Sequence, residues 1–473
     1  MSSRPLRFVQ AGDFLLHQPF DGLMDVPDHL AQRLIEAPYR VAERVFDAAI
    51  AENVDFVVLV GNLCDPHRAG PRGLVFLADQ ISRLAERGIA VYWASAETDR
   101  GADRPAHLQW PAGVHRFAAN RVEHLIHHRD GMPLCQIAGR SIDRNSRTSD
   151  LLAAAFAPSP DGLFSVAIVP GPAPGNAASL LAVGNRFWAC GGSRQPVTVL
   201  AEFDLPGVVH CAGTPQGRSP QDIGAFGCTL VRVENDGAIE PRDRIRLTSI
   251  ATDAIRWHDE RLLLPEAPDD SAIQRLLHER MQNLVAAAPD RVQLIRWTIE
   301  CGQPSGNRTS SSSSAGAELL AMLRSEYGAC EPPAWSVSLS IAPPQIPAAW
   351  SEQQTLVGEF LRRARTFESP EAEGAQLRVA LTDEEVTDEE VTDEEVTELP
   401  VDGSIDELLA PLLPAGPASL RQALLARLAD SDSRTSVLRQ AKALGAELLL
   451  PSGMQRNSLC HVGPSPRNEA SVR

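Results

Sequence analysis

The first 250 residues alternate between short apolar runs and amphipathic stretches. Continuous apolar runs of this kind are typical of strands buried on both faces, and apolar residues three and four positions apart indicate helices. The order of strands and helices predicts a central sheet with helices on its faces. The elements expected up to residue 93 are strands at Leu6–Gln10, Asp55–Val60 and Ala90–Trp93 and helices at Pro38–Ala51 and Leu74–Glu86.

From residue 164 the pattern changes to strands separated by turns. The expected strands are Phe164–Val169, Arg186–Cys190, Val197–Glu202, Val208–Cys211, Thr229–Glu234, Arg246–Thr248 and Ile255–His258. The residues Asn235-Asp236-Gly237 follow the fifth of them and are typical of a tight turn. This stretch therefore predicts a second set of strands in the same domain.

A smaller α+β unit is expected from about residue 253. It would contain helices at Ser271–Ala287 and Ala317–Tyr327 and strands at Asp290–Glu300 and Trp335–Ile341. Residues 302–316 are rich in Gly, Ser and Asn, with five consecutive Ser, and predict a flexible loop.

The last 130 residues read as mainly helical, with expected helices at Ser351–Phe367, Ser419–Leu428 and Ser436–Leu450. Thr-Asp-Glu-Glu-Val occurs three times from 382 to 396, and a five-residue period matches neither a helical stripe nor a strand. We therefore predict a disordered acidic repeat at 382–398. The predicted domains are 1–252, 253–345 and 346–473.

The net charge and the cysteine content argue against several classes of protein. The chain has a net charge of −17, of which ten acids lie in 382–398. A net acidic chain does not attract phosphate backbones from a distance, which argues against a free-standing DNA-binding protein. Eight Cys without a C-x-x-C pair argue against zinc ribbons and a disulfide framework. The absence of a long apolar run and of a signal pattern predicts a cytoplasmic protein with no membrane partner.

Six segments, in order along residues 5–250, resemble one family of enzymes. They are Asp13–Leu23, Gly61–Asp65, Ala96–Asp99, Val169–Gly171, Phe187–Arg194 and Ala212–Glu234. They resemble the motifs of the calcineurin-like metallophosphoesterases, and more narrowly those of the DNA repair exonuclease SbcD and its YhaO-type relatives. The resemblance implies a mixed α/β (α+β) fold. That fold is a four-layer sandwich of two packed sheets flanked by helices, followed by a small α+β capping domain and helical C-terminal segments.

The resemblance also indicates that the family's binuclear metal site is degenerate. Such a site holds two cations about 3.5–4 Å apart, bridged by a carboxylate, with an activated water as nucleophile. Asp13 is kept, Asn62 stands at the bridging Asp, and Glu97 stands at the family Asn. The family's histidine positions are occupied by Leu15, Thr98, Pro170, Gly192 and Arg194. We therefore expect no catalytic residue and no bound metal, with Asp13, Asn62 and Glu97 as residual candidates.

Two other arrangements of these residues stay open. His17 and His67 could form a rewired site with Asp13, Asp65 and Glu97, and two Mn ions would then be the cofactors. Arg140, Arg186 and Arg194 could instead hold a phosphate without metal, because Arg is suited to bidentate contact. Asp65 and Asp99 are expected to bind loop backbone.

The leading hypothesis is a catalytically inactive SbcD-type homologue, a pseudoenzyme that acts as a scaffold or regulatory subunit in DNA repair. By resemblance its partner would be an SbcC-like coiled-coil ATPase, contacted through Ser351–Phe367. DNA would be reached through that complex, and a homodimer is compatible with the family pattern. The alternatives are an active metal-dependent exonuclease or phosphodiesterase with a rearranged site, and a metal-free protein that binds nucleotides or DNA ends.

Overall fold

The computed structural model describes residues 5–362 with gaps, together with residue 442. The gaps are 24, 97–109, 143–152, 159–161, 173–176, 201–206, 235–244, 265–269, 302–311, 343–347, 353 and 356–357. The chain divides into two compact units. The first unit comprises residues 1–260, 271–297 and 317–339, and the second comprises 261–270, 298–316 and 340–473. The domain boundaries expected from the sequence stay a prediction.

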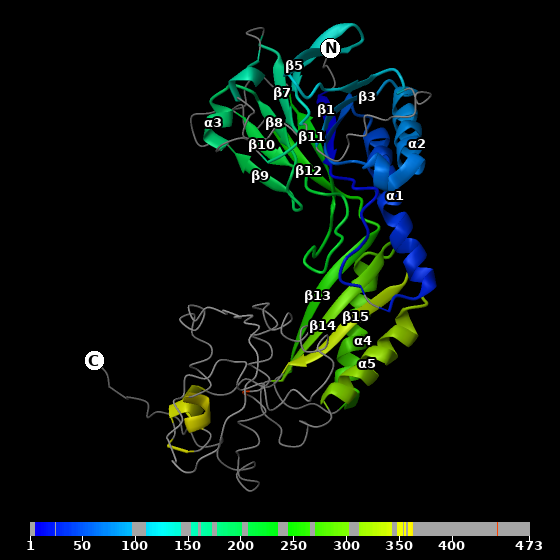
Figure 1. The fold of residues 1–473 in the computed structure, drawn as a ribbon, viewed down its shortest axis with the longest axis vertical. Helices are drawn as coiled ribbons and strands as arrows, with labels where there is room; N and C mark the ends of the chain where they lie inside the picture. Colours follow the sequence, from blue (N-terminus) through cyan, green and yellow to red (C-terminus); the bar gives the residue numbers. More distant parts are fainter. Residues whose placement is uncertain are drawn as a thin grey trace, which may run out of the picture. The chain divides into compact units, whose positions relative to one another are not determined.

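Two six-stranded sheets form the body of the first unit (Figure 1). In spatial order the first sheet contains β12 (Ile245–Ala251), β11 (Gly227–Val233), β1 (Leu6–Gly12), β2 (Phe56–Gly61), β3 (Ala90–Ser95) and β4 (Val114–Arg116). The second contains β5 (Glu123–Arg129), β6 (Met132–Gly139), β7 (Phe164–Val169), β8 (Phe187–Cys190), β10 (Val208–Cys211) and β9 (Val197–Leu200). Strands β1, β2 and β3 run parallel to one another, as do β7, β8 and β10.

Alternation along β1 shows how the layers form. Successive side chains of a strand point to opposite faces, so Val9 joins the core under the helices while Phe8 joins the core between the sheets. Helices α1 (Asp28–Ala51) and α2 (Pro66–Ala85) cover the outer face of the first sheet. The outer face of the second sheet is covered by η3 (Ala153–Phe156) and α3 (Ala177–Leu181), which pack on Trp188. The predicted fold class, two packed sheets flanked by helices, is confirmed.

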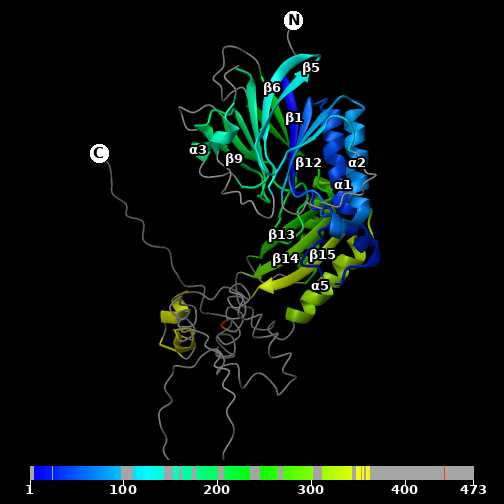
Figure 2. The same cartoon turned by 45° about the horizontal axis from the view of Figure 1, so that its top comes forward.

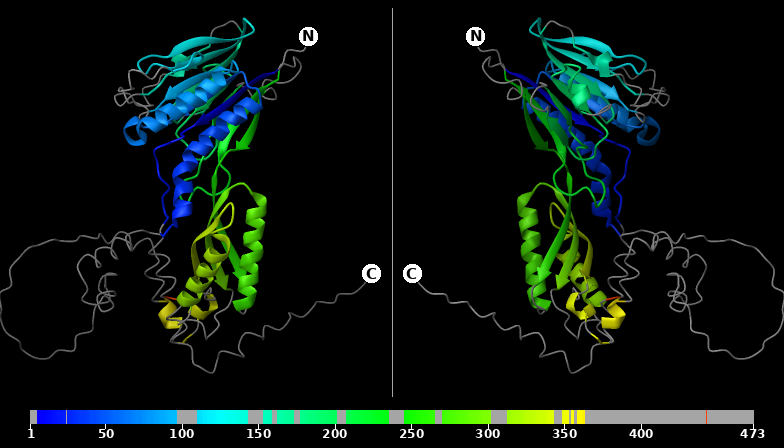
Figure 3. Two further views of the ribbon diagram at one scale, coloured as in Figure 1. Left: turned by 90° about the vertical axis from the view of Figure 1, so that its right-hand side faces the viewer. Right: turned by 90° about the vertical axis from the view of Figure 1, so that its left-hand side faces the viewer.

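A third sheet contains β13 (Ile255–Leu264), β14 (Val292–Cys301) and β15 (Ala334–Ala342) (Figures 2 and 3). Along the chain, α4 (Asp270–Ala287) connects β13 to β14, and α5 (Ser312–Tyr327) connects β14 to β15. Within the first unit, the N-terminal half of α1 packs on this sheet. Leu30 and Val41 of α1 share a buried cluster with Trp257, Leu294 and Trp335. Helix α1 therefore shares an apolar cluster with this sheet, apart from the cores of the sandwich.

Two features of the sandwich were not expected from the sequence pattern. Helix α1 begins at Asp28, ten residues before the predicted start, and continues through Pro38 because Leu30, Ala37 and Val41 extend its apolar stripe. The β5–β6 hairpin was missed because burial does not follow residue polarity there: Ile126 and Met132 are exposed, whereas His127 is buried. Asp130 and Gly131, with φ of 52° and 77°, make the two-residue turn that joins its strands.

Two predictions in the later part of the chain were wrong. The flexible loop expected at 302–316 ends earlier, since α5 begins at Ser312. The single helix expected at Ser351–Phe367 is broken within its described part. There η4 (Ala348–Glu352) ends, and Thr355 caps a new helical turn at 358–362 by accepting the N–H of Gly358 at 3.1 Å.

Several expectations fall outside the described residues. They are the turn at 235–237, the acidic repeat at 382–398, the helix at 419–428 and, apart from residue 442, the helix at 436–450. Among the helices of the described ranges, none is long and apolar enough to cross a membrane.

Candidate functional site

A pocket opens at the edge of the sandwich where parallel strands of both sheets end. Loops that follow β1, β2, β8 and β10 meet there, because the carboxyl ends of parallel strands share one edge of a sheet. The cavity measures about 220 Å³. Its lining residues are Asp13, Leu15, Asn62, Gly192, Ser193, Arg194, Thr214, Gln216 and Arg218.

Asp13 follows β1 directly and is held by two backbone groups. Its Oδ1 accepts the N–H of Asn62 at 2.9 Å, and its Oδ2 accepts the N–H of Gly192 at 3.4 Å. Burial raises the pKa of Asp13, and the two backbone N–H groups work against that rise. The carboxylate therefore ties the loop after β2 to the loop after β8.

Two glycines allow this close approach. A Cβ on Gly61, whose φ is +91°, would lie 2.5 Å from Oδ1 of Asp13. A Cβ on Gly192, whose φ is +78°, would lie 2.7 Å from Cδ of Pro172. Any side chain at either position would strain the backbone and displace a neighbour, so glycine is required at both.

Leu15 reaches the pocket through an unfavourable backbone conformation. Its φ is 48°, a region that costs a branched residue roughly 1–3 kcal/mol. Its N–H donates to the carbonyl of Asn62 at 3.1 Å, which holds the loop in place. The site therefore keeps a strained loop while presenting an aliphatic side chain, which has no lone pair for a ligand.

Arg194 and Arg218 share one carboxylate at the pocket wall. The Nη2 of Arg194 lies 3.3 Å from Oδ2 of Asp222, and its Nη1 lies 3.5 Å from Oγ of Ser219. The same Oδ2 accepts the backbone N–H groups of Arg218 and Ser219 at 2.8 and 3.0 Å. Arg218, 1% exposed, donates instead to the carbonyls of Phe14 and Gln18.

Burial lowers the pKa of Arg218 and the positive charge of Arg194 adds to that effect, so that the pKa is about 10. Arg218 therefore remains a cation at neutral pH. Its charge lies directly behind the pocket wall.

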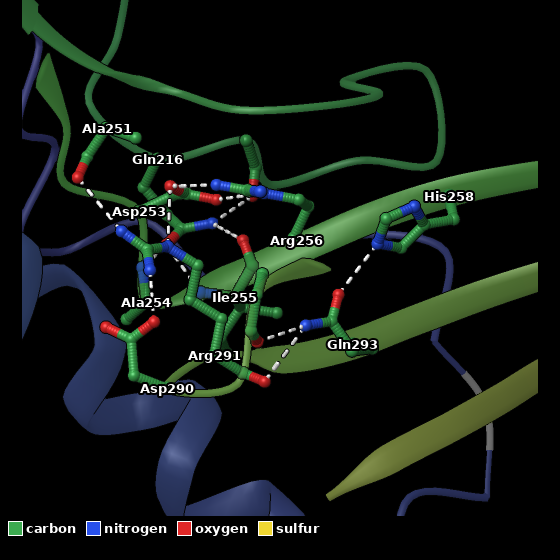
Figure 4. Close-up of polar contacts among 12 residues, drawn as sticks. Gln216, Ala251, Asp253, Ala254, Ile255, Arg256, His258, Asp290, Arg291 and Gln293 are labelled. Carbon is green, nitrogen blue, oxygen red and sulfur yellow. Dashed lines mark hydrogen bonds and ion pairs between the residues drawn. The ribbon is translucent and has the colours of Figure 1, made fainter. Parts of the chain in front are cut away.

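Gln216 connects the pocket to the third sheet. It is fully buried, and its Oε1 accepts the N–H groups of Ala254 and Ile255 at 3.0 and 3.2 Å. Its Nε2 donates to the carbonyl of Ile255 at 2.7 Å. The start of β13 is thus fixed to the loop after β10 (Figure 4).

A buried carboxylate stands beside this connection. Asp253 is 0% exposed and accepts two hydrogen bonds from Arg256, at 2.8 and 2.9 Å, and one from Arg291 at 3.1 Å (Figure 4). Arg44 of α1 donates to the Asp253 carbonyl. The network therefore links α1, the β12–β13 turn and the start of β14 within the first unit.

The pocket brings together five of the predicted site positions. Asp13, Leu15, Asn62, Gly192 and Arg194 all line it. Buried Pro170 lies next to it, since its carbonyl oxygen would be 3.0 Å from a Cβ on Gly191. Glu97, Thr98 and Asp99 lie outside the described residues.

The donors that the structure describes at the pocket do not fit a binuclear metal centre. Among the lining residues that the structure describes, Asp13 is the one carboxylate, and there is no imidazole or thiol. The described ranges also contain no group of three or more His, Cys, Asp or Glu placed to hold a metal ion. Asn62 is neutral and Arg194 carries a positive charge, so neither suits a position that bridges or ligates a dication.

His17, Asp65 and His67, three members of the alternative metal site, make hydrogen bonds at the start of α2. Nδ1 of His17 accepts the backbone N–H of Asp65 at 3.1 Å. Asp65 caps α2 by accepting the N–H of His67 at 2.9 Å, so its backbone contact is with the first turn of the helix and not with the loop that was expected. Burial lowers the pKa of His17, and Asp65 partly opposes that shift. These groups serve the entry to α2.

The three predicted phosphate-binding arginines are not gathered at this pocket. Arg194 lines it, whereas Nε of Arg140 donates to the carbonyl of Ala119 at 2.8 Å. Arg186 precedes β8 and Arg194 follows it, so the two lie at opposite ends of that strand.

Sequence reasoning missed the roles of Ser193, Thr214, Gln216 and Arg218. Its available signal was the segment 212–234, in which Gln216 and Arg218 are large polar residues among small residues and Pro. Nothing in that pattern says that both side chains are buried.

Comparisons with known proteins relate part of the chain to one relative by sequence. No family model matches the chain. The Bacillus subtilis protein named uncharacterized metallophosphoesterase YhaO is 28% identical over 240 residues, which is 49% of this chain and 58% of the relative. This chain is similar to a metallophosphoesterase. The match spans little more than half of the relative's length.

A solved structure, a dimetal phosphatase from Danio rerio, aligns with a TM-score of 0.33 at 9% identity. It covers 52% of this chain and 96% of the phosphatase. A score at this level carries no argument about this chain.

Proposed function

We propose that this chain is a catalytically silent relative of the SbcD-type phosphoesterases that serves as a scaffold or regulatory subunit in DNA repair. The observation that carries the proposal is the pocket where a metal centre would lie. Its described lining offers one carboxylate, Asp13, and two arginines. The similarity to a metallophosphoesterase supports the superfamily part of the proposal.

The physical argument concerns charge. Two dications about 3.5–4 Å apart repel each other and need a bridging carboxylate to remain together. Asn62, Leu15 and Gly192 supply no negative charge, and Asp13 already accepts two backbone N–H groups. Arg194 beside a dication at about 4 Å would add a repulsion on the order of 8 kcal/mol at an effective dielectric near 20.

The proposed partner is a coiled-coil ATPase related to SbcC, inferred from the family resemblance alone. The net charge of −17 supports a role in which DNA is reached through that partner. A scaffold of this kind needs a stable fold and an interface, and it needs no turnover of its own.

Metal analysis and a nuclease assay on one preparation test the proposal. The purified full-length chain is examined for metal content by mass spectrometry and for manganese-dependent cleavage of linear DNA. Asp13→Ala removes the lining carboxylate, and Asp21→Ala, an exposed acid outside the lining, is the matched control.

We expect far less than one metal per chain and no cleavage in all three proteins. Stoichiometric metal with cleavage that Asp13→Ala abolishes and Asp21→Ala retains would establish the active-enzyme alternative instead. Co-purification with a coiled-coil ATPase would support the scaffold role.

A further inference from the structure

Two buried cysteines lie side by side in the second sheet. Cys190 ends β8 and Cys211 ends β10, and these parallel strands are neighbours (Figure 1). The register pairs Cys190 directly with Cys211. Cys190 belongs to the cluster on the outer face of the sheet together with Val209, and Cys211, two residues after Val209, points to the same face. The two thiols are therefore adjacent on that face.

The spacing of the pair suits a disulfide. Neighbouring strands lie about 4.7–4.9 Å apart, and the Cα atoms of disulfide-bonded cysteines are usually about 4.4–6.8 Å apart. The thiols are also close enough to interact, because the charge of Cys211 adds to burial in raising the pKa of Cys190. Joining the sulfurs therefore requires side-chain rotation and leaves the pairing of the strands intact.

Cys211 is better placed than Cys190 to react first. Its Sγ lies 4.0 Å from the carbonyl oxygen of Ser193, which lines the cavity, so a small oxidant in the cavity comes close to this sulfur. Burial raises the pKa of Cys211, and the backbone of Gly213 and Ser193 opposes that rise. At Cys190 no such contact opposes burial, and its pKa is about 12. Because the thiolate is the nucleophile, attack on an oxidant starts from Cys211.

Both cysteines stand at the base of loops that form the cavity wall. The lining residues 192–194 follow Cys190, and the lining residues between 214 and 218 follow Cys211. The two loops already touch, since the N–H of Thr214 donates to the carbonyl of Arg194 at 3.0 Å. A bond between the sulfurs would tie the loops at their base. The oxidation state of the pair would then set how far these two parts of the wall can separate.

We propose that Cys190 and Cys211 form a reversible disulfide in the presence of a hydroperoxide, and that this bond holds the loops after β8 and β10 together. The Cys211 thiolate attacks one oxygen of hydrogen peroxide, which breaks the O–O bond and leaves a sulfenic acid and hydroxide. The hydroxide takes up the proton lost by the thiol and becomes water. The Cys190 sulfur then attacks the sulfenic sulfur, and the leaving hydroxide takes up the proton of Cys190 to give a second water. The two thiols thus lose two electrons, which reduce the peroxide.

Peptide mapping of the full-length chain tests this assignment. The reduced protein is treated with hydrogen peroxide, the remaining thiols are blocked with iodoacetamide, and the unfolded product is digested with trypsin. Because Arg194 lies between the two cysteines, a disulfide would join two tryptic peptides. Exposed Cys330 serves as an internal measure of how far the peroxide oxidises an ordinary thiol.

Two variants separate the pair from the other thiols. Cys190→Ala removes one member of the pair. Cys135→Ala is the matched control, because Cys135 is also buried in a strand of the second sheet but has Phe164 and His127 as register partners. Circular dichroism checks that each variant is folded, and the mapping of wild type depends on neither variant.

We expect peroxide to join the peptides of Cys190 and Cys211 in wild type and in Cys135→Ala, and dithiothreitol to separate them. In Cys190→Ala the link should be absent, and Cys211 should accumulate sulfinic acid instead. The oxidised wild type should unfold at a temperature roughly 5–10 °C above that of the reduced protein, because the closed loop restricts the unfolded chain.

Three results would count against the assignment. The first is an absent link under conditions that oxidise Cys330 completely. The second is a link that forms only after the chain has been unfolded in urea. Either one would overturn the disulfide, and equal unfolding temperatures of the oxidised and reduced proteins would refute its role in holding the loops together.

Discussion

Replacement of Asp253 by Asn should be one of the most damaging single polar changes in the first unit. The substitution keeps the size of the side chain and removes its negative charge. Two buried cations, Arg256 and Arg291, would then lose the carboxylate that receives three of their hydrogen bonds (Figure 4).

The magnitude follows from burial and from the contacts that remain. Asp253 is 0% exposed, and the side chains of Arg256 and Arg291 are 15% and 14% exposed. Breaking a buried ion pair by removing one partner typically costs about 3–5 kcal/mol, because the other charge stays buried and uncompensated. Arg291 keeps Asp290 and the carbonyl of Ala251 as partners, so we expect a value near 3 kcal/mol.

Urea unfolding followed by tryptophan fluorescence measures this loss, since Trp257 is buried on β13. Asp290→Asn is the matched control, because Asp290 pairs with the same Arg291 but its side chain is 60% exposed. It should cost less than about 1 kcal/mol. Equal losses in the two variants would refute the reasoning that burial decides the contribution of each acid.

Three further predictions concern other parts of the sandwich. Burial lowers the pKa of His210 to about 4 in the folded chain, below its value of about 6.5 in the unfolded chain. The contribution of neutral His210 to the free energy of unfolding is therefore complete above pH 6.5 and is lost as pH falls toward 4. Wild type should therefore lose about 2 kcal/mol more stability than His210→Gln between pH 7 and pH 5, and parallel pH profiles would contradict this. Gly192→Ala should cost roughly 1–3 kcal/mol more in thermal unfolding than Gly113→Ala, because Gly113 also has a positive φ (+89° against +78°) but a Cβ there would meet nothing within 4 Å; equal shifts would exclude the contact with Pro172 as the cause. Asp55→Asn should cost about 3–5 kcal/mol in urea unfolding, because Asp55 receives a bidentate pair from Arg129, and a loss below 1 kcal/mol would disprove its importance.

The layers of the fold could be predicted because their signals are local. In buried strands such as 56–61 and helices such as α2, the spacing of apolar residues along the sequence shows which positions are buried. The β5–β6 hairpin and the first ten residues of α1 could not be predicted in this way. In the hairpin, burial does not follow residue polarity, and the start of α1 is stabilised by packing on the third sheet.

For the candidate site, too, some features could be predicted from the sequence and others depend on the fold. The chemical identity of residues 13, 15, 62 and 194 is a property of the sequence, and the poor metal donor set that it predicts stays a prediction. Arg186 lies away from the pocket because it precedes β8, whereas Arg140 follows β6 at the pocket's edge of the sheet and donates to the carbonyl of Ala119.

The sequence by itself therefore determined the kinds of layers and the side chains available for chemistry, because both depend on residue types at short spacing. Only the tertiary structure decided that Arg194 and Arg218 share Asp222, and that Gln216 joins the pocket to β13. The charges and hydrogen bonds of the pocket act across loops that follow four different strands. Which of these groups come within hydrogen-bond distance is settled only when both sheets and their connections have packed.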